Sequence, residues 1–302
     1  MALTPEHLRI DPERVSQKLE NFIKTSVGDF NRQGAIVGLS GGLDSSVVLA
    51  LSVAALGSSK VLVLIMPERD SSQDSESDAR LQAEPLGVRV EKIELTPILD
   101  EMGIYKHIPK AIFARKKIAG AMAKEGYKLY TRVTGKRILL SGLEGTNMGI
   151  LKRANAYYRI KHRLRMVLLY SYAERENLLV VGTANKTEFL TGFFVKYGDS
   201  AADIMPLSPL YKTQVRQLAE FYHIPERIIH KAPSPDLIPG ITDEFAIGIP
   251  YEKLDLILSG LDTKMTMKEI AAKTGVKQET IDYVKELVRR SEHMRTPPLV
   301  PD

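Results

Sequence analysis

Cysteine is absent from this sequence of 302 residues, and tryptophan is absent as well. Without cysteine the chain has no disulfide, no zinc site with thiolate ligands and no cysteine nucleophile. Cysteine-dependent glutaminases and persulfide-carrying sulfur transferases are therefore excluded. Apolar runs long enough to cross a bilayer are also missing, and the polar start MALTPEHLRIDPERV is unlike a signal peptide. The sequence therefore predicts a cytoplasmic protein that does not bind membranes.

The rest of the composition is that of an ordinary globular protein, with 44% hydrophobic and 26% charged residues. The net charge of +5 is spread unevenly along the chain. Residues 101–165 hold sixteen Lys and Arg but only three Asp and Glu, whereas the remainder is acidic overall. A basic segment on an acidic body indicates an anionic ligand or partner, although a solvated helical face would give the same pattern.

Short apolar runs alternate with helical patterns, which indicates the fold class. The runs are continuous and lie at 35–40, 61–67, 88–95 and 178–183, and helices are expected at 11–30, 44–56 and 74–86. Continuous apolar strands separated by helices are typical of a parallel sheet that is covered on both faces. We expect one α/β domain over 1–302, with a doubly wound parallel sheet, helical elaborations and a basic helical insert at about 101–154.

The segment 264–293 contains two short amphipathic stretches on either side of Gly275. This pattern could be taken for a DNA-reading helix-turn-helix. Ordinary packing helices are the interpretation that we favour.

The most informative motif is Ser40-Gly41-Gly42-Leu43-Asp44-Ser45-Ser46, between the first strand and the helix that follows it. Glycines let the backbone approach an oxyanion, the helix N-terminus offers unpaired N–H groups, and serines add hydroxyl donors. The motif therefore predicts a phosphate site, although neither GxxxxGK[ST] nor GxGxxG is present. Asp44 would repel phosphates unless a cation lay between them, which indicates Mg²⁺. A serine-glycine turn that only caps the helix is the simpler alternative.

The sequence SGGLDSS resembles the signature of the N-type ATP pyrophosphatases of the PP-loop superfamily. That group includes GMP, asparagine, argininosuccinate and NAD synthetases and tRNA-lysidine synthetase. Its members split ATP between the α- and β-phosphates and adenylate a substrate oxygen, while the loop binds the departing pyrophosphate. The resemblance implies a fold like that of the adenine nucleotide alpha hydrolases, but it leaves the acid substrate open.

Longer blocks resemble the NAD synthetase family: RIKHRLRMVLLYSYA (159–173), VVGTANKTEFLTGFFVKYGDSAADIMPLSPLYKTQVRQLA (180–219), KAPSPDL (231–237), TDEFAIGIPYEKLD (242–255) and SEHMRTPP (291–298). With the loop, the resemblance covers about 10–95 and 155–300. Family members use ATP to adenylate the nicotinate carboxylate of deamido-NAD, and ammonia then displaces AMP. The missing cysteine implies the ammonia-dependent type, and the family is typically homodimeric.

The resemblance implies site residues as well. ATP would bind at Gly38, Leu39, Ser40, Gly41, Gly42, Leu43, Asp44, Ser45, Ser46, Thr183, Lys212 and Ser234. Mg²⁺ would bind at Asp44 and Glu188. Deamido-NAD would contact Arg163, Lys196, Asp203 and His293. The catalytic residues would be Asp44, Asp199 and Lys212, with Asp199 near the ammonia site as a base and Lys212 as a flexible point charge on the phosphates.

Three departures from the family lie on the substrate side. The usual Gly-Asp-Gly-Gly is Gly198-Asp199-Ser200-Ala201 here. If those positions require positive φ, the change costs on the order of 1 kcal/mol or more. Met294 replaces a lysine after His293, and 101–154 is longer and more basic than in the family pattern. A paralogue that adenylates a different carboxylate therefore stays open.

Two other classes of protein remain as alternatives. A tRNA-modifying adenylating enzyme would explain the basic segment, but residues 180–219 do not resemble those enzymes, so nucleic acid is an unlikely partner. A non-catalytic nucleotide-binding module would scarcely require both Asp44 and Glu188.

Overall fold

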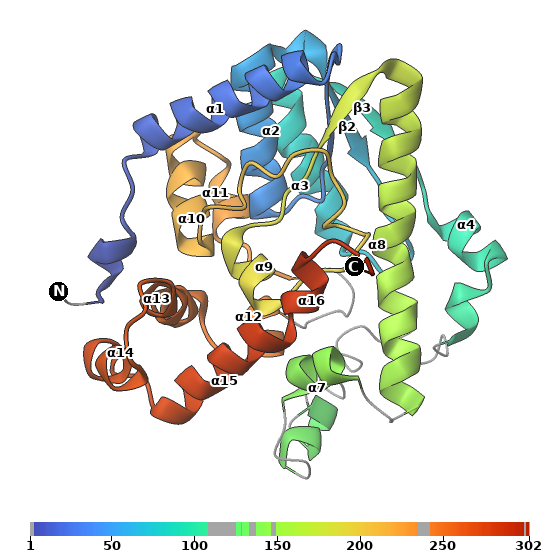
Figure 1. The fold of residues 1–302 in the computed structure, drawn as a ribbon. Helices are drawn as coiled ribbons and strands as arrows, with labels where there is room; N and C mark the ends of the chain where they lie inside the picture. Colours follow the sequence, from blue (N-terminus) through green and yellow to red (C-terminus); the bar gives the residue numbers. More distant parts are fainter. Residues whose placement is uncertain are drawn as a thin grey trace.

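A four-stranded parallel sheet lies at the centre of the computed structural model (Figure 1). Its strands are β1 (Gly34–Gly38), β2 (Val61–Ile65), β3 (Arg89–Lys92) and β4 (Leu178–Val181), in the order β3-β2-β1-β4. In the register, Ile36 lies between Leu62 and Val180. The structure describes residues 3–107, 125–127, 129–132, 137–145, 149–234, 242–298 and 300–301.

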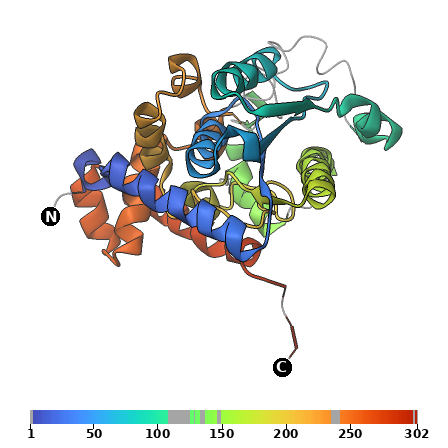
Figure 2. The same ribbon diagram turned by 90° about the horizontal axis from the view of Figure 1, so that it is seen from above.

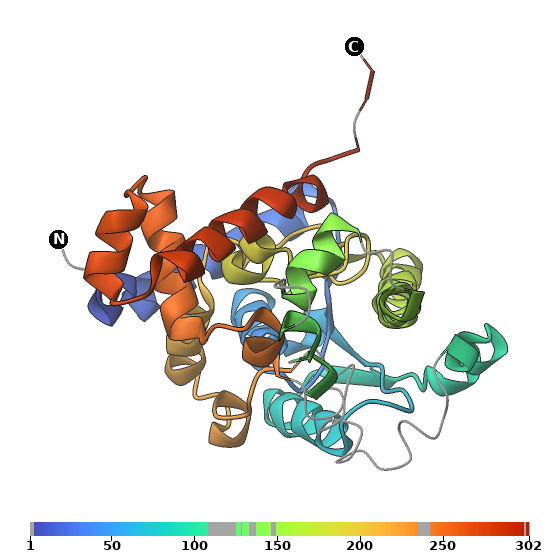
Figure 3. The same cartoon turned by 90° about the horizontal axis from the view of Figure 1, so that it is seen from below.

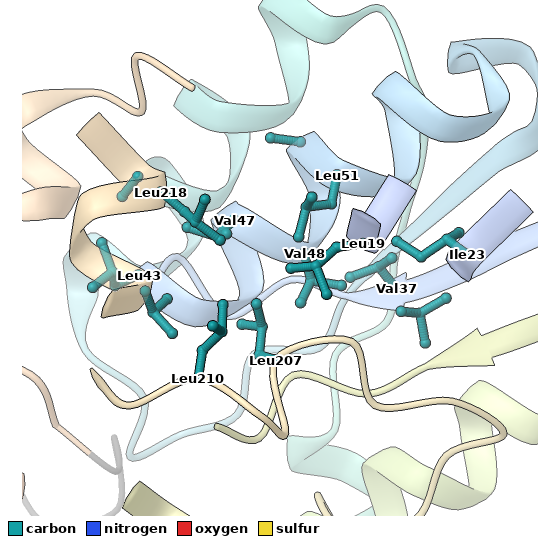
Figure 4. Packing of buried hydrophobic residues seen from close by; sticks show 14 of the residues in the cluster. Leu19, Ile23, Val37, Leu43, Val47, Val48, Leu51, Leu207, Leu210 and Leu218 are labelled. Carbon is teal, nitrogen blue, oxygen red and sulfur yellow. The ribbon is translucent and has the colours of Figure 1, made fainter. Parts of the chain in front are cut away.

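Neighbouring residues of a strand point to opposite faces of a sheet. Because the buried strands are apolar at successive positions, both faces are apolar and helices cover both. On one face lie α1 (Pro12–Asp29), α2 (Leu43–Leu56), α3 (Gln73–Ala83) and α10 (Lys212–Phe221), whereas α8 (Gly149–Glu176) lies on the other (Figure 2). Val37 packs in the apolar core between the sheet and helices α1, α2 and α10, shown in Figure 4. Ile36 packs in the core between the sheet and α8. The predicted doubly wound α/β fold is confirmed.

The third strand differs from its prediction. It covers only Arg89–Lys92 rather than 88–95, and it forms one edge of the sheet. Arg89 and Lys92 are exposed, and they pair with Glu176 at 2.5 Å and with Glu76 at 2.7 Å, respectively. The prediction of a fully covered apolar strand is wrong here, because an edge strand has one neighbour and needs less apolar surface.

The other helices are α4 (Thr96–Glu101), α7 (Ile138–Glu144), α9 (Lys186–Thr191), α11 (Glu226–Ile229), α12 (Asp243–Ile247), α13 (Tyr251–Asp262), α14 (Met267–Thr274), α15 (Gln278–Arg290) and α16 (Glu292–Arg295). Short 3-10 turns are η1 (Pro5–Leu8), η2 (Ser58–Lys60), η3 (Glu84–Leu86) and η4 (Ile104–His107). Helices α13, α14 and α15 share a separate apolar core (Figure 3). Gly275 ends α14 at φ +69°. The amphipathic stretches are therefore packing helices.

Much of the predicted basic insert at about 101–154 lies outside the described residues, namely 108–124, 128, 133–136 and 146–148. Its described parts include η4, α7 and the start of α8, which are helical as expected. The Tyr127 hydroxyl donates to the Ala246 carbonyl at 2.5 Å, and Arg137 donates to the Gly248 carbonyl at 3.1 Å. These bonds attach the insert to α12. Among the described ranges, no helix has the length and apolar character needed to span a membrane.

Candidate active site

The glycine-rich loop connects β1 to α2 at the carboxyl end of the sheet. Ligands bind at that end in doubly wound folds, where helices from neighbouring strands pass to opposite faces. Gly41 has φ +73°, and a Cβ atom there would lie 2.2 Å from the Ser75 carbonyl oxygen. Only glycine fits this position, both for its backbone conformation and for the space available. The loop is therefore pressed against α3 and holds its backbone in one shape.

Serine hydroxyls fix the remaining shape of the loop. The Ser46 hydroxyl donates to the Gly42 carbonyl at 2.8 Å, and the Ser45 hydroxyl donates to the same oxygen at 3.1 Å. The Ser40 and Ser45 hydroxyl oxygens are 3.0 Å apart, and the Gly42 N–H donates to the Ser40 hydroxyl at 3.2 Å. Leu39 and Leu43 point into the core. Their contribution to a ligand would therefore come from the backbone.

Asp44, Glu188 and Lys212 meet beside this loop. The Lys212 ammonium donates to Asp44 Oδ2 and lies 3.5 Å from Glu188 Oε1. The lysine is only 3% exposed. Although burial opposes the charge, the Asp44 and Glu188 carboxylates hold the pKa of Lys212 above its ordinary value. The structure thus brings together three residues that are far apart in the sequence, with the cation between two acids.

The acid at position 188 is held by a local helix-start motif. The Asn185 side chain accepts from the Glu188 N–H at 3.0 Å, and Glu188 Oε2 accepts from the Asn185 N–H at 3.2 Å. This capping box satisfies two otherwise free donors at the start of α9. Asn185 also donates its amide to Asp44 Oδ1 at 3.0 Å. Asn185 is a site residue that the sequence reasoning missed, although its spacing before Glu188 was a usable signal.

Burial next to Asp44 gives Glu188 an unusual affinity for protons. Loss of hydration and the nearby Asp44 charge, which Lys212 offsets only in part, together raise the pKa of Glu188 to about 8. Two adjoining carboxylates with too little positive charge form an oxygen-donor set suited to a hard divalent cation. The residues present therefore fit Mg²⁺.

Three further buried groups support this cluster, and sequence reasoning missed them. The Tyr251 hydroxyl donates to Asp243 Oδ2 at 3.1 Å. Asp255 accepts from the Thr187 hydroxyl at 2.6 Å and from the Thr213 N–H at 2.8 Å. Burial raises the pKa of both Asp243 and Asp255 to about 6. All three lie in the matching block 242–255, but no spacing rule would place that block against α9 and α10.

The predicted dinucleotide residues Arg163, Lys196 and His293 form a second group. Arg163 donates through Nε and Nη2 to the Lys196 carbonyl at 3.4 and 3.3 Å. Lys196 Nζ donates to the His293 carbonyl at 2.8 Å and to the Thr296 carbonyl at 3.1 Å. The three residues therefore connect α8, the loop after α9 and the C-terminal segment. Each of these four bonds ends on a backbone carbonyl oxygen, so no acid neutralises Arg163 or Lys196 through them.

Only part of the basic run around Arg163 is available to an anion. Lys161 is fully buried and donates to Glu68 at 3.0 Å and to Asp70 at 2.7 Å. Arg165 donates to the Met66 carbonyl at 3.3 Å. The two carboxylates neutralise the charge of Lys161 inside the fold. These ion pairs hold α8 against the segment after β2.

The loop of Asp199, Ser200 and Asp203 is shaped by hydrogen bonds. Asp199 accepts from the Val195 N–H at 2.7 Å, and its other oxygen lies 3.6 Å from His162 Nδ1. Ser200 accepts from the Tyr197 N–H at 3.2 Å and donates to the Val195 carbonyl at 3.1 Å. Residues 200 and 201 do not have positive φ. The strain considered for the missing glycines is therefore absent, and Ser200 bonds in a way that glycine could not.

Asp203 has partners at the end of the sheet rather than a free carboxylate. Its Oδ2 accepts from the Val180 N–H at 2.8 Å, and its Oδ1 accepts from the Tyr170 hydroxyl at 3.2 Å.

Thr183 is half-buried just beyond β4, and Ser234 is exposed. The Pro233 carbonyl, next to Ser234, accepts from the Asp243 N–H at 2.8 Å. This bond ties the Ser234 segment to α12.

Similarity to known proteins extends over nearly the whole chain. The family model for NAD synthase matches residues 15–128 and 146–298. The NH(3)-dependent NAD(+) synthetase of Thermotoga maritima is 44% identical over 289 residues, which cover 93% of this chain and 96% of that protein. The enzyme of the same name from Methanocaldococcus jannaschii is 37% identical, with 96% and 97% covered.

Solved structures agree with this similarity. An NH3-dependent NAD synthetase from Campylobacter jejuni has a TM-score of 0.68 and 26% identity, covering 97% of this chain and 100% of that one. An NMN synthetase from Francisella tularensis has a TM-score of 0.70 and 28% identity, with the same coverage. Together with the loop and the carboxylates beside it, these similarities show that the chain belongs to the NAD synthase family.

Proposed function

We propose that this protein is an ammonia-dependent NAD synthetase, which amidates deamido-NAD at the expense of ATP and releases AMP and pyrophosphate. The observation that carries the proposal is the buried Lys212 between Asp44 and Glu188, next to the loop fixed by Gly41. The curated relatives are NH(3)-dependent NAD(+) synthetases and match almost end to end. The absence of cysteine agrees with free ammonia as the nitrogen source.

The ATP half of the site consists of the loop and the three charged residues. Loop N–H groups and the start of α2 would bind the two departing phosphates, because a helix N-terminus favours anions. Lys212 would neutralise negative charge as the bond between the α- and β-phosphates breaks. Thr183 and Ser234 would contact the rest of the nucleotide. These assignments follow the family pattern, and the loop and Thr183 also lie just beyond the carboxyl ends of β1 and β4.

Asp44 and Glu188 would hold Mg²⁺ in this proposal. The metal ion, when bound, supplies charge neutralisation for the triphosphate and the leaving pyrophosphate. Glu188 has a pKa raised to about 8 through burial and the Asp44 charge, so cation binding would relieve that repulsion. Asn185 would keep both carboxylates oriented through its bonds to them.

The dinucleotide half would use Arg163, Lys196 and His293, which already adjoin one another. Arg163 and Lys196 are cations whose bonds in this structure go to backbone carbonyls, so each can exchange those acceptors for phosphate or carboxylate oxygens. Asp203 would accept from ribose hydroxyls only if its bond from Tyr170 opens. Asp199 would hold ammonium and take its proton before the nitrogen attacks the acyl carbon and AMP leaves.

One incubation tests the reaction. The protein is mixed with ATP, Mg²⁺, deamido-NAD and ammonium, and NAD and AMP are followed together; we expect them in equal amounts. A parallel sample contains nicotinate mononucleotide as the acid, because Met294 replaces a family lysine and one solved neighbour is named as an NMN synthetase. Amidation of the mononucleotide alone would overturn deamido-NAD as the substrate. Asp44→Asn should abolish AMP formation while circular dichroism stays unchanged.

The homodimer predicted from the family resemblance stays a prediction, which light scattering on the purified protein would check. A dimer is expected at about twice the chain mass of 33.7 kDa.

A further inference from the structure

Asp243, the first residue of α12, is a buried carboxylate, and only one of its two oxygens accepts a hydrogen bond from the described residues. The residue is 5% exposed, and its Oδ2 accepts from the Tyr251 hydroxyl at 3.1 Å. Its Oδ1 is fully buried and has no hydrogen-bond partner in the described part of the chain. An unsatisfied buried acceptor destabilises the folded chain, and a charged one does so more strongly. Such a group calls for an explanation beyond the stability of the fold.

The surroundings of Asp243 point to Lys212. The Tyr251 ring that fixes Asp243 also lies under the lysine, with Nζ 5.4 Å from the ring centroid. The charges of Lys212 and Asp44 both act on Asp243. Within the described residues, no ion pair joins Lys212 to Asp243, since the ammonium bonds to Asp44 and lies 3.5 Å from Glu188. Asp243 is thus a third carboxylate near a lysine that is engaged elsewhere.

The charges around Lys212 explain why a third carboxylate would be useful. Asp44, Glu188 and Asp243 together carry three negative charges when ionised, and Lys212 supplies one positive charge. The excess of two equals the charge of one divalent cation. A cation held by Asp44 and Glu188 would compete with the ammonium for the same two carboxylates and would repel it. The lysine side chain is long and flexible, so it can move to another acceptor.

We propose that Asp243 is the alternate counter-ion of Lys212 and receives the lysine ammonium when a divalent cation binds Asp44 and Glu188 in the absence of nucleotide. Tyr251 holds Oδ2, so Oδ1 remains available to accept. Asp243 acts through Lys212 and is therefore a positioning residue. The inference rests on the metal role given above to Asp44 and Glu188. It adds a residue that decides where Lys212 goes once the cation is present.

Binding of Mn²⁺ in the absence of nucleotide tests the inference without measuring activity. Electron paramagnetic resonance reports free Mn²⁺ for the wild type, Asp243→Asn, Lys212→Met and the double variant. We expect Asp243→Asn to weaken binding by about tenfold when Lys212 is present and by less than about threefold when it is absent, since coupled neighbours are non-additive. Glu244→Gln is the matched control, because it removes a charge next to Asp243 and should leave Mn²⁺ affinity nearly unchanged.

Equal weakening by Asp243→Asn in both backgrounds would overturn the inference, because a direct metal ligand or a general field effect behaves in that way. If Lys212→Met does not fold, a crystal structure of the wild type with Mn²⁺ decides instead. We expect Lys212 Nζ within hydrogen-bond distance of Asp243 Oδ1, and a lysine still on Asp44 would refute the proposal. A nucleotide-free wild type that binds no Mn²⁺ also refutes it, whereas NAD formation separately tests the proposed reaction.

Discussion

Replacing Asp243 by Asn should make the metal-free protein more stable at neutral pH. Burial raises the pKa of Asp243 to about 6 in the folded protein, from an ordinary value of 3.8. The ionised carboxylate is therefore less favourable in the folded chain than in the unfolded one. Asparagine has nearly the same shape, carries no charge and can still accept from the Tyr251 hydroxyl. The substitution thus removes a cost while keeping the packing.

The size of the effect follows from the difference in pKa. One pKa unit corresponds to about 1.4 kcal/mol, so a rise of roughly two units makes ionised Asp243 cost up to about 3 kcal/mol. The folded chain holds this proton more tightly than the unfolded chain. Its stabilising contribution is therefore fully present below about pH 4 and is lost as the pH rises through about 6. Asparagine cannot titrate, so the variant lacks this dependence.

Urea unfolding with EDTA, monitored by circular dichroism between pH 4 and 7.5, measures this difference. We expect Asp243→Asn to exceed the wild type by about 2–3 kcal/mol at pH 7, and the gap to close toward pH 4. Glu244→Gln serves as the control and should not reproduce the pH-dependent gap. A variant that is less stable than the wild type at pH 7 would refute the reasoning. It would mean that attraction to Lys212 outweighs the loss of hydration.

Further substitutions probe the loop, the support behind the site and the substrate segment. Gly41→Ala should lower the melting temperature and abolish ATP binding, because the new Cβ would lie 2.2 Å from the Ser75 oxygen, whereas Gly87→Ala, at a left-handed position with open space around it, should cost only about 1–2 kcal/mol of backbone strain. Thr187→Val should cost about 1–3 kcal/mol in urea unfolding, since it leaves Asp255 and the Lys212 N–H without their shared hydroxyl. Ser200→Gly should raise the KM for deamido-NAD and cost about 1 kcal/mol, because two loop hydrogen bonds are lost; an unchanged KM would contradict the role of that hydroxyl.

Sequence patterns predicted those features of the structure that depend on residues close together in the chain. The apolar run before Gly41 predicted β1, and the pattern after the glycines predicted the helix α2, because both depend on neighbouring residues. The strand at 88–95 was predicted too long, since its apolar residues do not reveal that β3 is an edge strand with exposed ends. Sheet order depends on pairings between distant segments, which no single run encodes.

The site shows the same division between local and distant causes. Asn185 could have been found from its spacing before Glu188, because a capping box is a local motif. Asp243, Tyr251 and Asp255 could not, since their importance comes from packing against α9 and α10. The cost suggested for Ser200 was also a local estimate, and the loop avoids it because residues 200 and 201 do not have positive φ.

Lys212 shows why local rules fail at this site. It is the first residue of α10, where the helix dipole disfavours a cation by about 0.3–1 kcal/mol. Burial disfavours the charge as well, yet nearby carboxylates hold the pKa of Lys212 above its ordinary value. Asp44, Glu188 and Asp243 all lie in first turns of helices, where acids are favoured. Lys212 therefore carries its charge at a helix position that disfavours a cation, and this charge depends on three acids from other helices. Such an arrangement is hard to explain by stability alone, and it agrees with the movable positive charge that we propose for Lys212.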